Sequence, residues 1–316
     1  MEHRSPHESV LLEEAITGLA IARDGVYIDA TFGRGGHSKA ILSKLGEQGR
    51  LVVFDRDPDA IEVANKLAAA DSRVEVVRSA FSELGSVIES LGLHGKVDGV
   101  LFDLGVSSPQ LDNPDRGFSF MRSGPLDMRM DPDEGMSAQQ WINSAREKDI
   151  ADVIYKYGEE RHSRRMARKI VEERTEAPIT DTGRLAEIIK HANPAWERDK
   201  HPATRAFQGI RIFINNEFGE IESGIAQALG CLKIEGRLVV ISFHSLEDRI
   251  IKKFISRQTK GDNFPRDLPV MSSELSPTLK SIGKAAKAKP QEVAANPRAR
   301  SAVLRVAEKI SNKGSE

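Results

Sequence analysis

The sequence has little of what marks a secreted, disulfide-bonded or membrane-spanning protein. Its 316 residues include one cysteine, Cys231, which excludes an internal disulfide and any zinc site built on cysteine pairs. It contains no HExxH motif, and we expect no bound metal. No apolar run approaches the ~20 residues of a membrane span, and Met1–Ala15 carries charges where a signal peptide needs apolar residues. These absences predict a cytoplasmic protein with no membrane partner.

The net charge of −1 is unevenly distributed along the chain. The segment Arg249–Glu316 carries 15 Lys and Arg against 6 Asp and Glu, a net charge of +9, which leaves −10 for the rest. A basic end on an acidic body favours an anionic partner, whereas the alternative is a solvated tail.

Apolar runs alternate with helical patterns in the first third of the chain, which is typical of a βαβ series. We therefore expect an α/β fold with a Rossmann-like, doubly wound sheet. The expected strands are Val26–Ile28, Leu51–Phe54, Val74–Val77, Val97–Phe102, Arg237–Phe243 and Ala302–Val306, and the intervening helices are Ser38–Leu45, Pro58–Ala70 and Phe81–Leu91.

The gap of about 130 residues before the fifth strand predicts an inserted helical domain, since its apolar residues recur at helical spacing. We expect residues 1–110 to form the first part of the sheet domain, 111–204 the insertion and 205–316 the second part. Arg205–Leu229 reads as one amphipathic helix, although Glu217 falls on its apolar side. Residues 258–297, rich in Lys, Ser, Ala and Pro, predict a mobile basic loop.

A glycine-rich turn follows the first strand. It contains Gly33, Gly35 and Gly36, and glycines at such a turn let a ligand approach the backbone closely. The second strand ends at Asp55, where an acidic residue can accept both ribose hydroxyls of a nucleoside. Ser38 stands where a dinucleotide site needs Gly or Ala, and Asp29 would repel a pyrophosphate but suits a cationic sulfonium. The turn therefore favours S-adenosylmethionine over a dinucleotide, with an empty structural turn as the alternative.

Candidate chemical groups follow the third, fourth and fifth strands. Phe81 is either a wall for an adenine ring or ordinary core. Asp103, Ser108 and the carbonyls around Pro109 could hold the N–H groups of an exocyclic amine and turn its lone pair towards a methyl carbon, or could simply form a capped turn. His244 could accept a proton, whereas Ser245 and Asp248 suggest a plain helix cap.

Together these residues resemble the bacterial MraW/RsmH-type methyltransferases. The matching segments cover nearly the whole chain: His7–Leu11, Asp29–His37, Phe54–Pro58, Phe102–Gln110, Arg116–Phe120, Pro125–Arg129, Arg205–Gln208, Ser242–Arg249 and Asn296–Ser301.

The resemblance implies an S-adenosylmethionine-dependent enzyme that methylates N4 of a cytidine in the decoding centre, in the P-site region of 16S ribosomal RNA within the small subunit. It implies cofactor contacts at Gly35, Gly36, His37, Asp55, Phe81, Asp103 and Gln110, to which the turn adds Gly33. The broader class of amino-methyltransferases places an aromatic after this Ser108-Pro109 position, and here Gln110 follows instead. The base-stacking ring must then come from elsewhere, and Phe118, Phe120 or the inserted domain could supply it.

The basic segment, together with Arg161, Arg164, Arg165 and Arg168, is expected to contact RNA phosphates. The sequence is also compatible with a homodimer. Three other functions stay open at this stage: a nicotinamide-dependent oxidoreductase, a non-catalytic assembly factor that binds ribosomal RNA, and a DNA cytosine N4-methyltransferase.

Overall fold

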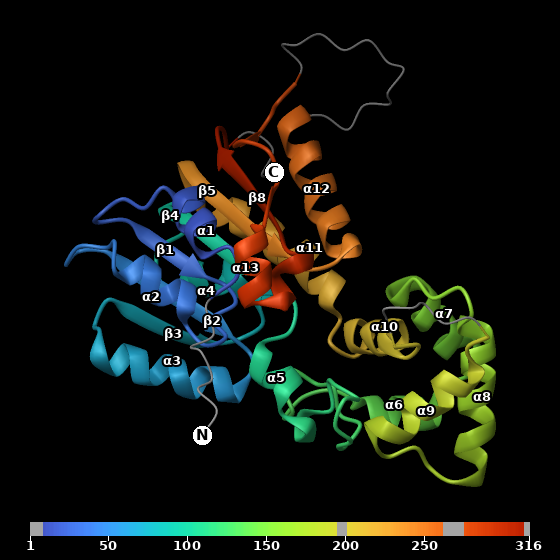
Figure 1. Cartoon of the computed structure of the whole chain (residues 1–316). Helices are drawn as coiled ribbons and strands as arrows, with labels where there is room; N and C mark the ends of the chain where they lie inside the picture. Colours follow the sequence, from blue (N-terminus) through green and yellow to red (C-terminus); the bar gives the residue numbers. More distant parts are fainter. Residues whose placement is uncertain (1–8, 195–200, 262–274, 313–316) are drawn as a thin grey trace. The chain divides into compact units, whose positions relative to one another are not determined.

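The computed structural model describes residues 9–194, 201–261 and 275–312 (Figure 1). His7 and Glu8 of the first matching segment lie outside the described residues. The chain divides into two compact units, one made of Met1–Gly105 with Phe218–Glu316 and the other of Val106–Glu217. We call them the sheet unit and the inserted unit, and describe each by itself.

The sheet unit is built on one mixed sheet in the order β3-β2-β1-β4-β5-β8-β6, with β7 also paired to β8. The pairs from β3 to β5 are parallel, and β8 is antiparallel to its neighbours. The strands are β1 (Val26–Asp29), β2 (Arg50–Asp55), β3 (Val74–Arg78), β4 (Val97–Asp103), β5 (Leu232–Ser242), β6 (Leu279–Ser281), β7 (Ala286–Lys287) and β8 (Val303–Lys309). All six expected strands are thus confirmed, and the short β6 and β7 were not expected.

Helices cover both faces of this sheet (Figure 1), as the continuous apolar strands require. Successive side chains of β4 point to opposite faces of the sheet, because Val100 and Phe102 belong to the apolar core on one face and Leu101 to the core on the other. One face carries α4 (Leu84–Ser90), α11 (Glu217–Cys231) and α12 (Ser245–Lys260); the other carries α1 (Leu12–Leu19), α2 (Gly36–Leu42) and α3 (Pro58–Ala70). The helix expected over Pro58–Ala70 has those bounds, since Asp57 caps it and Pro58 occupies its first turn.

The inserted unit is helical and has its own apolar core, as expected. Its elements are α5 (Ser108–Asp112), the 3₁₀ turn η2 (Pro114–Arg116), α6 (Ala138–Ser144), α7 (Glu147–Gly158), α8 (Ser163–Glu176), α9 (Thr182–Ala192) and α10 (Thr204–Ile214). The unit begins at Val106 and ends at Glu217, so it is longer at both ends than the expected 111–204.

The expected single helix over Arg205–Leu229 is wrong, because the chain breaks between α10 and α11. Asn216 adopts a left-handed φ of 47°, which ends the helix. Glu217 accepts two hydrogen bonds from the Arg211 guanidinium, at 2.7 and 2.8 Å, so its place on the apolar side reflects a buried ion pair. The Asn215 side chain joins the same junction to the backbone at Met128 and Met130.

The expected mobile loop over residues 258–297 is also wrong in part. Residues 262–274 lie outside the described residues, but α12 continues to Lys260, and β6, β7 and α13 (Pro290–Ala295) follow. Antiparallel pairing to β8 gives β6 and β7 backbone hydrogen bonds despite their polar sequence. The 3₁₀ turn η4 (Pro297–Ser301) then leads into β8.

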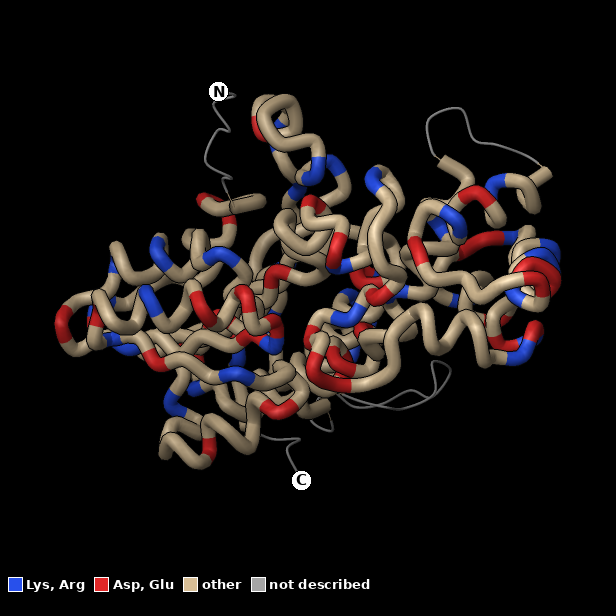
Figure 2. Tube along the Cα trace, turned by 90° about the horizontal axis from the view of Figure 1, so that it is seen from below, with Lys and Arg blue, Asp and Glu red and all other residues tan. Residues whose placement is uncertain are grey.

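Charged residues of both signs are interspersed along the trace (Figure 2). None of the helices in the described ranges is both long enough and apolar enough to cross a bilayer.

Candidate functional site

Three acidic residues lie at the carboxyl edge of the parallel strands. Asp29 ends β1, Asp55 ends β2 and Asp103 ends β4, and these strands are neighbours in the sheet. Ligands of open α/β sheets bind at this edge. The structure therefore brings the predicted carboxylates to the place where a ligand is expected.

The glycine turn after β1 is held against the end of β2. Gly33 and Gly35 have positive φ values of 55° and 73°, which a β-carbon would strain. A β-carbon on Gly36 would collide with the Ser9 hydroxyl, so this position admits only glycine while Ser9 lies there. Backbone conformation thus favours glycine at positions 33 and 35, and the close approach of Ser9 favours it at position 36.

Asp55 fixes the geometry of this turn. Its Oδ2 accepts from the Gly33 N–H at 2.8 Å, and its Oδ1 accepts from the Asp57 N–H at 2.9 Å. Burial raises the pKa of Asp55 to about 6. Each carboxylate oxygen keeps a second lone pair, so Asp55 can still accept two ribose hydroxyls when it is ionised.

Asp29 faces into the turn rather than outward. Its side chain is buried and accepts from the Ser38 hydroxyl at 2.6 Å and from the Thr31 N–H at 3.2 Å. Burial raises the pKa of Asp29 to about 6. Asp29 therefore links the end of β1 to the first turn of α2 through Ser38. Because its carboxylate is buried, it would act on a ligand through its charge and not by direct contact.

Among these three carboxylates, Asp103 carries the one oxygen that is buried and lacks a donor within the described parts of the chain. Its Oδ1 is buried without a hydrogen-bond partner, whereas Oδ2 lies 3.6 Å from His37 Nδ1. Burial raises the pKa of Asp103 to about 6, against the opposing effect of His37. A buried acceptor without a donor is costly, so it marks a place for an N–H group from a ligand.

His37 connects this carboxylate to the N-terminal segment. Its Nε2 lies 3.2 Å from the Val10 carbonyl, which can only accept, so we assign the ring proton to Nε2. Nδ1 then faces Asp103 Oδ2. Two lone pairs at that distance repel each other, so this contact is favourable when one proton lies between the two atoms.

Phe81 lies in the 3₁₀ turn η1 (Phe81–Glu83), directly after β3. Its ring meets Phe102 edge-on with centroids 5.5 Å apart, and a β-carbon on Gly224 would come within 2.6 Å of it. The side chain is half-buried. One part of the ring is therefore core, and the adenine contact stays a prediction.

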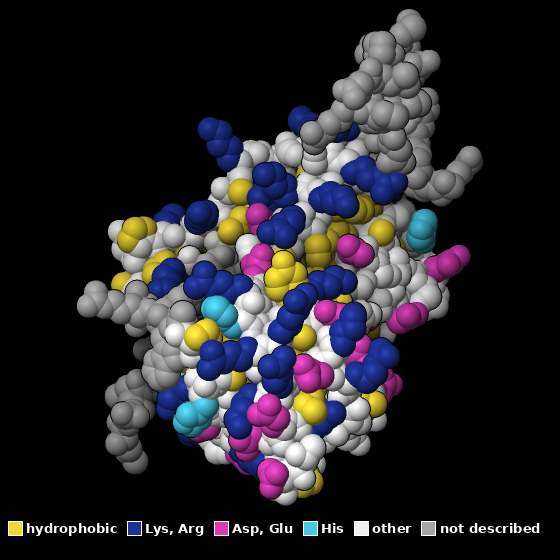
Figure 3. Space-filling model, turned by 90° about the vertical axis from the view of Figure 1, so that its right-hand side faces the viewer, with side chains coloured by type: hydrophobic (Ala, Val, Ile, Leu, Met, Phe, Trp, Pro, Cys, Tyr) yellow, Lys and Arg dark blue, Asp and Glu magenta, His cyan; other side chains and the backbone are white. Residues whose placement is uncertain are grey.

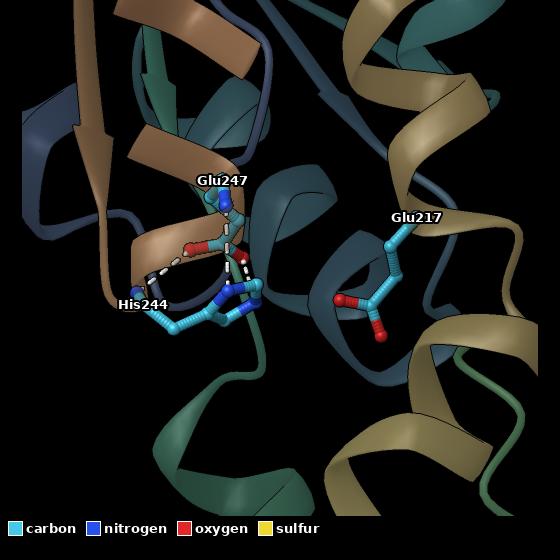
Figure 4. Close-up of side chains that lie close together, drawn as sticks. All are labelled: Glu217, His244 and Glu247. Atoms are coloured by element: carbon cyan, nitrogen blue, oxygen red, sulfur yellow. Dashed lines mark hydrogen bonds and ion pairs between the residues drawn. The ribbon is translucent and has the colours of Figure 1, made fainter. Parts of the chain in front are cut away.

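His244 is the N-cap of α12 (Figure 4), which corrects the expectation that Ser245 caps this helix. His244 Nδ1 accepts from the Glu247 N–H at 3.3 Å, and Nε2 lies 3.1 Å from Glu247 Oε1. The fully buried Glu247 also accepts from the backbone N–H groups of Phe243 and His244. Asp248, expected in the capping box, instead pairs with Arg305 at 2.7 and 2.9 Å.

This cap uses the histidine nitrogen that a base would need. Because Nδ1 accepts a backbone N–H, its lone pair is engaged, and Nε2, which lies 3.1 Å from Glu247 Oε1, is buried and makes no hydrogen bond within the described residues. The geometry favours the cap over the proton acceptor. Glu247 was missed as a site residue, although a Glu three positions after the cap is the capping-box signal.

Ser108, Pro109 and Gln110 belong to the inserted unit and begin α5. Ser107 is the N-cap, and the Gln110 Oε1 accepts from the Ser107 N–H at 2.9 Å in a capping box. Gln110 is buried and structurally engaged. The sequence pattern Ser-x-x-Gln predicts this cap, and the cofactor contact of Gln110 stays a prediction.

The two aromatic candidates for base stacking differ in accessibility. Phe118 is buried, with the Arg116 guanidinium 5.9 Å from its ring centroid. Phe120 is half-buried and packs on Phe207 and His201, with centroids 4.8 and 4.6 Å away. Phe120 is the better candidate, because part of its ring is exposed.

Comparison with known proteins gives one family match and many structural neighbours. Residues 4–310 match the model of the MraW methylase family. A putative rRNA-methylase from Clostridium thermocellum shares 12% identity at a TM-score of 0.44, covering 97% of this chain and 99% of its own. An rRNA methylase from Streptococcus thermophilus shares 10% identity at a TM-score of 0.43, and the match covers 97% of this chain and 100% of that one. A putative methyltransferase from Streptococcus mutans, solved in complex with SAH, shares 11% identity at a TM-score of 0.42, and the match covers 96% of this chain and 100% of that one. At such TM-scores these structures add nothing to the family match.

Proposed function

Because the chain belongs to the MraW methylase family, we propose that it methylates N4 of one cytidine in the decoding centre of 16S ribosomal RNA. Family membership makes it a methyltransferase, with S-adenosylmethionine as the methyl donor. The ribosomal substrate, the small subunit as partner and the N4 atom rest on the resemblance of its motifs. A homodimer stays a prediction.

The residues at the strand ends fit this cofactor. Gly33, Gly35 and Gly36 leave room beside the turn, and Asp55 offers acceptors for ribose hydroxyls. The buried Oδ1 of Asp103 is the observation that carries the proposal, because it needs an N–H donor. Both the ammonium group of S-adenosylmethionine and the exocyclic amine of cytosine are such donors. His37, Phe81 and Gln110 complete the proposed cofactor set.

The reaction requires orientation more than acid–base strength. When bound, S-adenosylmethionine supplies an electrophilic methyl group on a sulfonium. The cytosine amine is a weak nucleophile because its lone pair is delocalised into the ring. A carboxylate that accepts an N–H turns this lone pair towards the methyl group, and we assign this role to Asp103, with Ser108 and Pro109 as further acceptors. The base must first leave its stack.

We propose that His244 caps α12 and does not serve as the base that accepts the proton. Its Nδ1 is committed to the start of α12, and the proton lost after transfer can pass to water. Of the rival functions, the oxidoreductase does not agree with membership of a methylase family. A DNA cytosine N4-methyltransferase remains the rival to test.

The test uses labelled S-adenosylmethionine with undermethylated small subunits, followed by digestion of the RNA to nucleosides. We expect label in N4-methylcytidine at one site, and loss of turnover in Asp103→Ala. Asp98→Ala is the control for loss of a structural carboxylate, because Asp98 lies on the same strand away from its carboxyl end, where it accepts from the Val26 N–H and pairs with Lys233. If no nucleoside is labelled while S-adenosylmethionine still binds, or if Asp103→Ala retains turnover, the proposal is wrong.

A further inference from the structure

A row of arginines follows one side of α8 in the inserted unit. Arg164, Arg165 and Arg168 lie on the helix and Arg161 just before it, at spacings of three, four and seven residues from Arg161. Residues so spaced share one helix face. All four are exposed, while Met166, Ala167 and Ile170 on the same helix are buried in the core of the unit. We call the four residues the arginine row.

The arginine row places four exposed cations side by side without acidic partners, whereas several other basic side chains of the inserted unit form ion pairs. Arg146 pairs with Asp149, Lys169 with Glu173, and Lys190 with Glu187, at 2.7, 2.9 and 3.1 Å. No described acidic side chain pairs with Arg164, Arg165 or Arg168, and Arg161 contacts only the neighbouring His162 ring.

An excess of positive charge in the unit does not explain this difference. Val106–Glu217 carries 18 Lys and Arg against 19 Asp and Glu. The side of the molecule shown in Figure 3 displays many Lys and Arg side chains with Asp and Glu side chains among them. The four adjacent guanidinium groups are therefore a local concentration of positive charge that a polyanionic partner would stabilise.

The geometry points to a phosphodiester backbone as that partner. Arg164 to Arg168 span about 6 Å along the helix, at 1.5 Å per residue, and Arg161 extends the row beyond its N-terminus, so the row can meet neighbouring phosphates at once. Guanidinium groups bind phosphate oxygens in a bidentate manner, and such contacts position a protein without reading sequence. A protein partner would instead require apolar anchors between the charges, and the exposed row contains none.

We propose that the arginine row binds the backbone of ribosomal RNA outside the target nucleotide and so supplies substrate affinity but not chemistry. This inference rests on the proposed function for the identity of the RNA. The row lies in the inserted unit, whereas the glycine turn, Asp55 and Asp103 lie in the sheet unit. Cofactor binding should therefore be independent of it.

The test compares two triple variants in the full chain. Arg164→Gln/Arg165→Gln/Arg168→Gln removes three charges of the row, and glutamine keeps the helix propensity. Arg146→Gln/Lys148→Gln/Lys156→Gln removes three exposed charges from α7 and its N-cap in the same unit and is the control. Binding to undermethylated small subunits and to protein-free 16S RNA is measured over a range of salt concentrations, with S-adenosylmethionine affinity measured in parallel.

For the row variant we expect binding to both RNA forms to weaken at least about tenfold at low salt, with the slope of log K against log salt reduced by about 2 to 3. The KM for subunits should rise with little change in kcat or in cofactor affinity. Equal losses in the control variant, or binding to protein-free RNA that stays unchanged, would overturn the inference, and the second result would indicate a ribosomal protein as partner. If the wild type binds RNA through the row but labels no cytidine, only the proposed function fails.

Discussion

Replacing Asp55 by asparagine tests the assignment of this residue to the ribose. Both Asp55 oxygens accept a backbone N–H, one from Gly33 and one from Asp57. An asparagine has one acceptor oxygen, so its NH₂ group must face one of these two donors. One N–H in the turn then loses its partner, at a cost of about 1–3 kcal/mol.

A second effect of similar size opposes this loss in the free protein. Burial raises the pKa of Asp55 from 3.8 to about 6, so the ionised carboxylate is itself destabilising at pH 7. A pKa difference of about two corresponds to roughly 3 kcal/mol, which the neutral amide recovers. The two contributions nearly cancel, and we expect Asp55→Asn to change the free energy of unfolding by less than about 2 kcal/mol.

Cofactor affinity has no such compensation. A hydrogen bond to a charged acceptor contributes about 1.5–3 kcal/mol, and Asp55→Asn loses at least one. We therefore expect the Kd for S-adenosylmethionine to rise about 10- to 150-fold, because 1.4 kcal/mol corresponds to a factor of ten. S-adenosylhomocysteine, which has the same ribose, should weaken equally.

The measurements are isothermal titration with both ligands at pH 7.5 and denaturant unfolding of the free protein. Asp57→Asn is the matched control, because Asp57 caps α3 through Oδ1 and asparagine caps a helix equally well. A Kd for Asp55→Asn within threefold of wild type would refute the ribose assignment, as would an equal loss in Asp57→Asn.

Three further predictions concern pH, the helix junction and the histidine cap. Lowering the pH from 7.5 to 5 should weaken S-adenosylmethionine binding in titrations, because Asp55 and Asp103 have pKa values raised to about 6 and the proposed contacts need their ionised forms. Their contribution to the stability of the free protein has the opposite sign: it is present at low pH and is lost as the pH rises through about 6. Asn215→Ala should lower the free energy of unfolding by about 1–3 kcal/mol in denaturant titrations, since its amide bonds buried backbone groups in the 128–130 segment. His244→Asn should keep the cap and turnover within threefold, whereas His244→Ala should cost about 1 kcal/mol of stability; a large loss of kcat in His244→Asn with intact folding would restore the proton-acceptor role.

The strands and the position of the carboxylates could be predicted because they follow from short-range patterns. A buried parallel strand needs a continuous apolar run, and Leu51–Phe54 or Val97–Phe102 can be little else. An acidic residue directly after such a run must lie at the carboxyl edge of the sheet. Asp55 and Asp103 were therefore placed correctly without knowledge of their partners.

The helix junction could not be predicted because the apolar spacing continues across it. Ile210, Ile214, Ile221 and Ile225 keep a helical period on both sides of the left-handed Asn216. The one local sign was Glu217 on the apolar side, and its partner Arg211 lies six residues earlier, on the far side of the break. A helical wheel treats the two as members of one helix, whereas the break is what allows them to pair.

Contacts between the ends of the chain were also beyond the reach of sequence patterns, although they support the cofactor turn. The Leu11 N–H donates to Glu292 Oε1 at 2.7 Å, and Lys289 pairs with Glu14 at 3.1 Å. Leu11 itself has a left-handed φ of 52°, a conformation that costs about 1–2 kcal/mol for a residue other than glycine. The carbonyl of the preceding residue, Val10, accepts a hydrogen bond from His37 Nε2, and Nδ1 of the same ring faces Asp103. The basic C-terminal segment therefore does more than present charge: through Glu292 and Lys289 it holds the N-terminal residues in the conformation that orients the histidine beside the proposed reactive carboxylate.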